Sequence, residues 1–118
     1  MEFCFYIFCL LALVSCTDNK AEINTCNLNN PLEELAFLKD AKNNIDQIDC
    51  GGVSSIIQYT FNSAFVFEVN ICSQIADAQT LVYDCAGEIV CTFGGIAGVN
   101  TCPDFNENAT NKMILWEN

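Results

Sequence analysis

Cysteine is the residue type that most constrains how this chain can fold. Nine cysteines occur within 118 residues. A domain of this length buries only about two-thirds of its unfolded surface, so covalent cross-links add usefully to a small hydrophobic core. Cytosolic chains keep their thiols reduced, whereas small exported domains use cysteines as disulfide bridges. The cysteine content therefore indicates an oxidising compartment.

The beginning of the chain is typical of an export signal. Residues 3–14 (FCFYIFCLLALV) form an uncharged apolar run, which is too short to cross a hydrocarbon core of about 30 Å. The run ends in Leu13-Val14-Ser15-Cys16, which resembles the lipobox of bacterial lipoproteins. The resemblance implies removal of residues 1–15 as a lipoprotein signal peptide and acylation of Cys16 by fatty acids such as palmitate. An ordinary signal peptide with release of a secreted soluble domain is the alternative.

Six cysteines follow this segment, and an even number favours three disulfides. They are Cys26, Cys50, Cys72, Cys85, Cys91 and Cys102. Six cysteines allow 15 pairings. We favour Cys91 with Cys102 and, less firmly, Cys26 with Cys50, because short loops close at the least entropic cost. Structural zinc is the rival interpretation, but the chain has no histidine and no C-x2-C pair.

The charge of the chain excludes several classes of function. The formal net charge is −11, and the basic residues are four lysines, without arginine or histidine. Such a chain repels phosphate, which argues against nucleic acids and against anionic membrane surfaces as partners. Without histidine there is no Ser-His or Cys-His nucleophile pair and no imidazole ligand for a metal. We expect no cofactor, no metal and no enzymatic activity, and a membrane contact only through the lipid.

Two groups of acidic residues have a functional interpretation and a simpler one. Glu68, Asp84 and Glu88 could supply paired carboxylates for glycoside hydrolysis, although acids on strands more often face solvent. Residues 104–108 (DFNEN) begin like an EF-hand calcium loop. Ala109 and Leu115 stand where that loop requires Gly and Glu, so a solvated acidic loop is the favoured interpretation.

The periodicity of the mature chain predicts an α+β domain over residues 30–118, after a polar tether over residues 16–29. Asn30-Pro31-Leu32-Glu33 is a helix start with a capping box, and an apolar stripe continues to about residue 44. Alternating residues predict a first hairpin, with strands over 53–60 and 65–71 and a turn near Asn62-Ser63, then a second hairpin with strands over 80–84 and 88–93, and a last strand over 113–116. Phe65, Phe67, Val69 and Ile71 share the face that we expect to pack under the helix. We therefore predict one N-terminal helix packed on an antiparallel sheet of about four to five short strands, held by disulfides.

A glycine-rich stretch separates the last two cysteines. Residues 94–98 (GGIAG) lack the Gly-Lys-Ser/Thr of a Walker loop and the following helix of a dinucleotide-binding fingerprint. We expect a structural loop with positive φ angles or a close backbone approach.

Several short motifs together resemble a known group of proteins. They include Val82-Tyr83-Asp84, the glycine-rich stretch and Cys102-Pro103-Asp104-Phe105. Over residues 30–116 the chain is similar to uncharacterised small envelope lipoproteins of Bacteroidetes-type bacteria, a family labelled as a domain of unknown function. The resemblance implies a lipid-anchored protein of the outer membrane and supplies no catalytic residue.

The sequence favours a non-enzymatic binding or interaction module with a protein partner. A small inhibitor of a protease or another hydrolase is the alternative, by analogy with inhibitors that also place one helix over an antiparallel sheet. The discriminating feature would be a protruding loop over residues 94–101, made rigid by a disulfide and inserted into a partner's cleft.

Overall fold

Two β-hairpins form the centre of the protein. A computed structural model describes residues 22–118, so the expected signal peptide, Cys16 and the first part of the tether lie outside the described residues. The antiparallel sheet has six strands in the order β5-β4-β3-β2-β1-β6. The strands are β1 (Ser55–Phe61), β2 (Ala64–Asn70), β3 (Gln79–Tyr83), β4 (Ile89–Gly94), β5 (Val99–Asn100) and β6 (Thr110–Glu117). The predicted α+β class is confirmed.

Turn chemistry fixes the first hairpin. Asn62 and Ser63 join β1 to β2 with φ angles of 50° and 60°, the left-handed conformation that a tight two-residue hairpin turn requires. Phe61 pairs with Ala64, and the ladder continues to Ser55 opposite Asn70. Both predicted hairpins are present. The sheet has six strands instead of the predicted four to five, because β5 was not predicted; a strand of two residues leaves no alternating pattern in the sequence.

The predicted single N-terminal helix is wrong, because two short helices precede the sheet and a third, α3 (Phe105–Asn108), precedes the last strand. The chain forms α1 (Pro31–Glu34) and α2 (Ala36–Asp46), and Leu35 between them has extended backbone at φ −95° and ψ 111°. The predicted capping box also differs, because Oε2 of Glu34 accepts hydrogen bonds from the backbone N–H groups of Asn29 and Asn30 at 2.9 and 2.7 Å. Both Leu32 and Leu35 pack against the core. No helix within residues 22–118 is long and apolar enough to cross a membrane.

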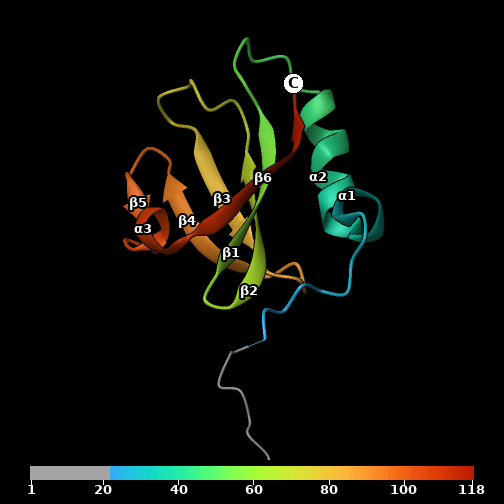
Figure 1. Ribbon diagram of the computed structural model, residues 1–118. Helices are drawn as coiled ribbons and strands as arrows, with labels where there is room; N and C mark the ends of the chain where they lie inside the picture. The colour runs from blue at the N-terminus through green and yellow to red at the C-terminus, as the bar shows by residue number, and fades with distance from the viewer. Residues whose placement is uncertain (1–21) are drawn as a thin grey trace, which may run out of the picture.

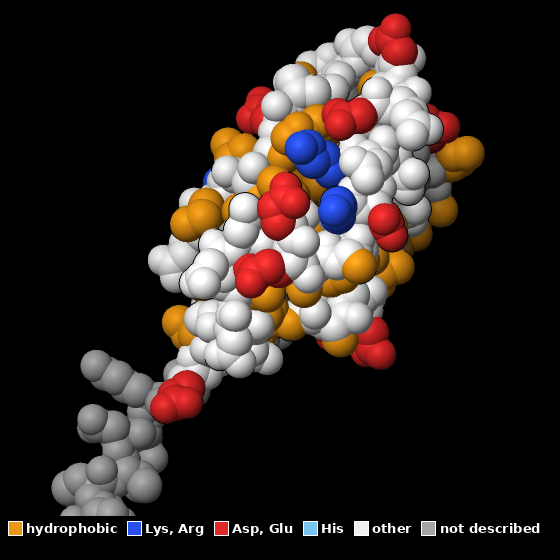
Figure 2. All heavy atoms as spheres, turned by 90° about the vertical axis from the view of Figure 1, so that its right-hand side faces the viewer, with side chains coloured by type: hydrophobic (Ala, Val, Ile, Leu, Met, Phe, Trp, Pro, Cys, Tyr) orange, Lys and Arg blue, Asp and Glu red, His pale blue; other side chains and the backbone are white. Residues whose placement is uncertain are grey.

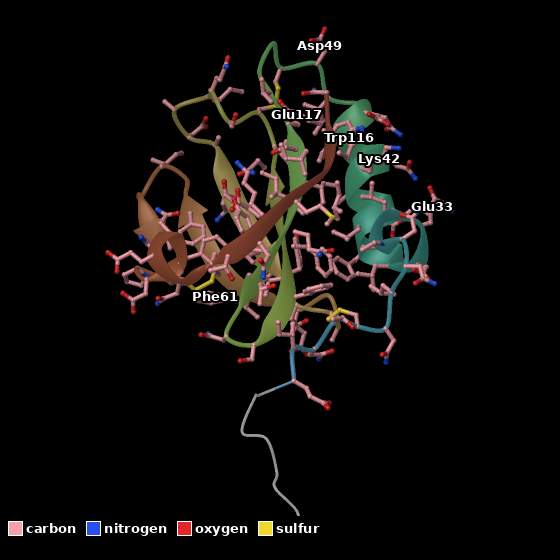
Figure 3. The ribbon with its side chains drawn as sticks, in the orientation of Figure 1. Glu33, Lys42, Asp49, Phe61, Trp116 and Glu117 are labelled. Atoms are coloured by element: carbon pink, nitrogen blue, oxygen red, sulfur yellow. A yellow bond between two sulfur atoms is a disulfide. The ribbon has the colours of Figure 1, made fainter. Side chains whose placement is uncertain are left out.

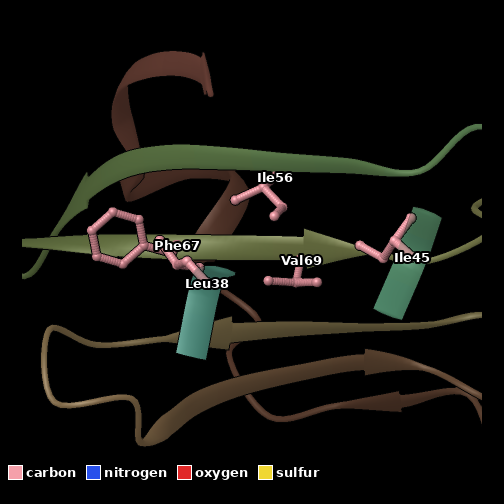
Figure 4. Close-up of a cluster of buried hydrophobic side chains, with 5 residues drawn as sticks. All are labelled: Leu38, Ile45, Ile56, Phe67 and Val69. Carbon is pink, nitrogen blue, oxygen red and sulfur yellow. The ribbon is translucent and has the colours of Figure 1, made fainter. Parts of the chain in front are cut away.

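The main core lies between α2 and one face of the sheet. Figure 1 shows α1 and α2 on one side of the sheet, with α3 (Phe105–Asn108) on the other. Figure 4 shows how the helix and two neighbouring strands supply the buried side chains. These are Leu38 and Ile45 from α2, Ile56 from β1, and Phe67 and Val69 from β2. The predicted packing of alternate β2 residues beneath the helix is confirmed.

All six cysteines of the described part are paired. The disulfides join Cys26 to Cys85, Cys50 to Cys72 and Cys91 to Cys102, with Cα atoms 5.6, 6.0 and 5.5 Å apart. The structure thus contains the favoured Cys91–Cys102 pair. The favoured Cys26–Cys50 pair is wrong, because loop length does not report where the chain passes in space.

The segment before the helices belongs to the domain. Asn24 forms a parallel bridge with Ala64. Its N–H donates to the carbonyl of Ser63 at 2.9 Å, and its carbonyl accepts from the N–H of Phe65 at 2.8 Å. These bonds hold Asn24 beside the first hairpin, which places Cys26 next to Cys85 in the β3–β4 turn. The folded part of the chain therefore begins before residue 30, within residues 16–29, which were expected to form a tether.

The glycine-rich stretch is a structural turn between β4 and β5, as predicted. Gly94 and Gly95 have φ angles of 81° and 77°. The N–H of Gly95 donates to the carbonyl of Ala78 at 2.9 Å, which brings that oxygen close to Gly94. A Cβ on Gly94 would lie 2.5 Å from the same oxygen, whereas a Cβ on Gly95 would have no atom within 4 Å.

We expect the two adjacent glycines to respond differently to alanine. Gly95→Ala should lower the free energy of unfolding by about 1 kcal/mol, the strain of a left-handed residue. Gly94→Ala adds a clash with the backbone oxygen of Ala78, and should lower the free energy of unfolding by about 3 kcal/mol or more. Urea denaturation of the two variants measures the difference. Equal losses of unfolding free energy would show that the close approach to Ala78 does not affect stability.

Candidate functional site

The candidate site lies on the open face, which we define as the face of the sheet opposite α1 and α2. Phe105 of α3 is 3% exposed and packs onto this face. Its ring centroid lies 5.4 Å from Tyr59, 5.1 Å from Phe61 and 5.4 Å from Phe93. Since α3 covers only the middle of the open face, a hollow remains on each side of Phe105.

The first hollow, named the polar hollow, has a volume of about 260 Å³. Its lining residues are Glu68, Thr80, Phe93, Phe105 and Asn106.

Hydrogen bonds fix the polar side chains beneath and beside the polar hollow. Nδ2 of Asn70 donates to Oε1 of Glu68 at 2.7 Å and to Oγ of Ser55 at 3.1 Å. Oγ1 of Thr80 donates to Oδ1 of Asn70 at 2.7 Å. Asn70 therefore holds Glu68 and Thr80 in place across two neighbouring strands.

Tyr59 lies beside this network. Burial raises the pKa of the Tyr59 hydroxyl above its usual value of 10.0, and the nearby negative charge of Glu68 raises it further. A raised pKa keeps the hydroxyl protonated, so Tyr59 is a hydrogen-bond donor throughout the neutral range. Because the pKa of Tyr59 is higher in the folded chain, ionisation of the hydroxyl destabilises the fold. The free energy of unfolding should therefore begin to fall from this cause only as the pH rises above 10.

The second hollow, named the acidic hollow, has a volume of about 370 Å³. Figure 3 labels Phe61 at this end of the sheet, close to a yellow disulfide. Three parts of the chain form the walls, so the hollow exists only in the folded chain. The lining residues are Phe61, Asn62, Ala64 and Val66 of the first hairpin, Asp84 and Val90 of the second hairpin, and Thr101, Cys102, Pro103 and Asp104 of the segment leading into α3.

The two carboxylates of the acidic hollow differ in how they are held. Oδ1 of Asp84 accepts hydrogen bonds from the N–H groups of Ala86 and Glu88 at 2.9 and 3.0 Å, which fixes the carboxylate in the β3–β4 turn. Its other oxygen, Oδ2, has no hydrogen-bond partner among the described residues. Asp104 is the exposed N-cap residue of α3, and its side chain makes no capping bond. Both carboxylates are therefore available to a ligand.

The lysines of the described part lie away from both hollows. Lys39 and Lys42 are on α2, and Figure 2, which views the helix side, shows blue lysine side chains among red acidic ones. Lys112 is on β6 and lines neither hollow. The two hollows thus carry acidic side chains that no lysine in their walls neutralises.

Residues 44–118 match a family model described as "Domain of unknown function (DUF6970)". The chain belongs to this family. No curated protein and no solved structure matches the chain. The DUF6970 match begins near the end of α2 and includes all six strands, α3 and both hollows, whereas Cys26 and most of α2 precede it. The predicted resemblance to an uncharacterised domain is confirmed, over a shorter range than residues 30–116.

The predicted acidic groups are distributed differently from a catalytic pair or a calcium loop. Glu68 lines the polar hollow and Asp84 the acidic hollow, while Glu88 is exposed in the β3–β4 turn. Asp104 is the N-cap of α3 and residues 105–108 form that short helix, so the segment is neither an EF-hand loop nor the favoured solvated loop. Within residues 22–118 no group of three or more His, Cys, Asp or Glu residues could hold a metal ion. Cys16, the expected lipidation site, lies outside the described residues.

The central role of Phe105 was not predicted from the sequence. The only signal was an aromatic residue within a polar segment between Cys102 and β6. An apolar ring in such a segment needs a place to be buried, which predicts contact with an uncovered sheet face. Neither hollow had a local sequence signal, because each combines segments distant in the chain.

Proposed function

We propose that this DUF6970 protein is a lipid-anchored, non-enzymatic binding module of a diderm bacterial envelope, attached to the outer membrane through Cys16. The observation that carries the proposal is the complete pairing of the six described cysteines as three disulfides. Such cross-links persist in oxidising compartments outside the cytosol. The apolar run that ends in Leu13-Val14-Ser15-Cys16 supplies the corresponding export and acylation signal.

The open face is the surface that we assign to binding. Its two hollows lie on either side of Phe105 and are lined by side chains that hydrogen bonds and a disulfide hold in position. Preorganised side chains lower the entropic cost of binding. A short acylated tether would present this face to soluble or surface-bound partners, since several acyl chains on one cysteine anchor a domain durably.

Metabolic labelling with an alkynyl fatty acid tests the anchor. We expect the wild-type chain to incorporate the label and Cys16→Ala to lose it, because the thiol of Cys16 is the proposed acylation site. Cys9→Ala, which changes a cysteine inside the apolar run, is the matched control and should keep the label. Labelling of Cys16→Ala, or no labelling of the wild type, would contradict the proposal.

One observation favours hydrolase inhibition as a second candidate. Ile96 at the tip of the β4–β5 turn is 92% exposed, and the Cys91–Cys102 disulfide spans the base of this loop. An exposed apolar side chain on a rigid loop suits insertion into a partner's cleft. If this candidate is correct, the domain should slow at least one protease of a broad panel, and Ile96→Ser should relieve the inhibition. No inhibition of any protease would remove it.

A further inference from the structure

We propose that the acidic hollow binds a lysine or arginine side chain presented by a partner protein. This inference deepens the proposed binding role and rests on it.

The shape and lining of the acidic hollow fit a long amphipathic side chain. Its volume of about 370 Å³ lies at the low end of the range for small-ligand pockets, which suits one side chain better than a large cofactor. Phe61, Val66 and Pro103 contribute apolar surface to the lining. Lysine and arginine bury their aliphatic stems on such surface and keep the charged head at a polar rim.

The charge of the hollow selects a cation. Asp84 and Asp104 both line it, and Oδ2 of Asp84 has no hydrogen-bond partner among the described residues. A guanidinium or ammonium group placed between them would replace water by charge-assisted hydrogen bonds. The formal net charge of −11 adds a long-range attraction for basic partners.

The surroundings of the hollow favour a polypeptide over a free amine. Val90 on β4 lines the hollow and is 40% exposed. Thr101 runs beside Thr92 at the edge of β4, but it leaves this part of Val90 open to a partner. Residues that flank a bound basic side chain can therefore contact apolar surface, which a free amine would leave exposed.

The test uses a matched pair of short peptides and the full chain in neutral detergent. One capped pentapeptide carries a central arginine between glycines, and its counterpart carries citrulline, which has almost the same shape without the charge. Chemical shifts of backbone amides report binding and its location. We expect the arginine peptide to shift the signals of Val66, Val90 and Thr101, and the citrulline peptide to bind at least about tenfold more weakly, a factor equal to about 1.4 kcal/mol.

The matched variants separate the hollow from the overall charge. Asp84→Asn with Asp104→Asn removes two charges but keeps an Oδ1 acceptor for the β3–β4 turn. Asp40→Asn with Asp46→Asn removes two exposed charges from α2, on the other side of the sheet. The first pair should weaken binding of the arginine peptide at least about tenfold, and the second less than about twofold.

Three results would overturn the inference: equal binding of the two peptides, unchanged binding by the Asp84/Asp104 variant, or an equal loss in the Asp40/Asp46 variant. These results are distinguishable from a failure of the proposed function. Fatty-acid labelling of Cys16 tests the lipid anchor, and its result does not depend on the acidic hollow. Capture of one envelope protein equally by the wild type and by the Asp84/Asp104 variant would keep the binding role and overturn the inference about the acidic hollow.

Discussion

Loss of the Cys26–Cys85 disulfide should destabilise the domain more than loss of either other disulfide. The three bridges close loops with sequence separations of 59, 22 and 11 residues. In the chain-entropy model, cross-links over these separations raise the free energy of the unfolded chain by about 4, about 3.5 and about 3 kcal/mol. Because a small domain has a total stability of about 5–15 kcal/mol, the chain with all three bridges reduced should be largely unfolded at 37 °C.

Paired Cys→Ala variants and urea denaturation measure this ranking. Each variant removes both cysteines of one bridge, so neither is left as an unpaired thiol that could exchange with the other bridges. Circular dichroism before and after reduction gives the fraction folded at 37 °C. A fully reduced chain that keeps its cooperative transition would contradict the dependence of this small core on its disulfides.

Phe67→Ala should be among the most destabilising single substitutions in the core. Phe67 is fully buried on the central strand β2, and its ring meets Phe37 of α2 edge-on at 6.2 Å. Truncation of a buried phenylalanine leaves a cavity between helix and sheet, which typically costs about 3–5 kcal/mol. Urea denaturation should show a loss of that size, with an unchanged slope if the variant still unfolds in two states.

Phe65→Ala is the matched control, because it removes the same side chain from the same strand and face. Phe65 is only partly buried and lies near the edge of the helix-side core. We expect it to lose clearly less stability than Phe67→Ala. Equal losses from the two substitutions would show that the core is not centred beneath α2.

Local rules were enough to predict the hairpins from the sequence. Alternation of apolar residues along β2 identified the helix-facing set, and Asn62-Ser63 marked the turn. Both signals depend on neighbours in the chain. The helix break at Leu35 did not follow from local rules, since a continuous apolar stripe gives no reason for an interruption that tertiary packing imposes.

Tertiary placement explains the parts that the sequence could not predict. Cys26 reaches Cys85 because Asn24 bridges to Ala64, and no spacing rule contains that contact. Phe105, which the chain brings back onto the open face after β5, lines the polar hollow, and the residues just before it line the acidic hollow. Asp84 and Asp104 could be recognised as acidic residues in the sequence, but only the folded sheet shows that they line the same hollow.

Disulfide mapping of the chain recovered from the bacterial envelope tests the central claim most directly. The claim is that this DUF6970 domain is exported and folded around three disulfides. Alkylation of the intact chain, proteolysis and non-reducing mass spectrometry should identify the linked peptides Cys26–Cys85, Cys50–Cys72 and Cys91–Cys102, with none of these six thiols alkylated. Two or more alkylated cysteines among these six, or recovery of the reduced chain from the cytosol, would contradict it.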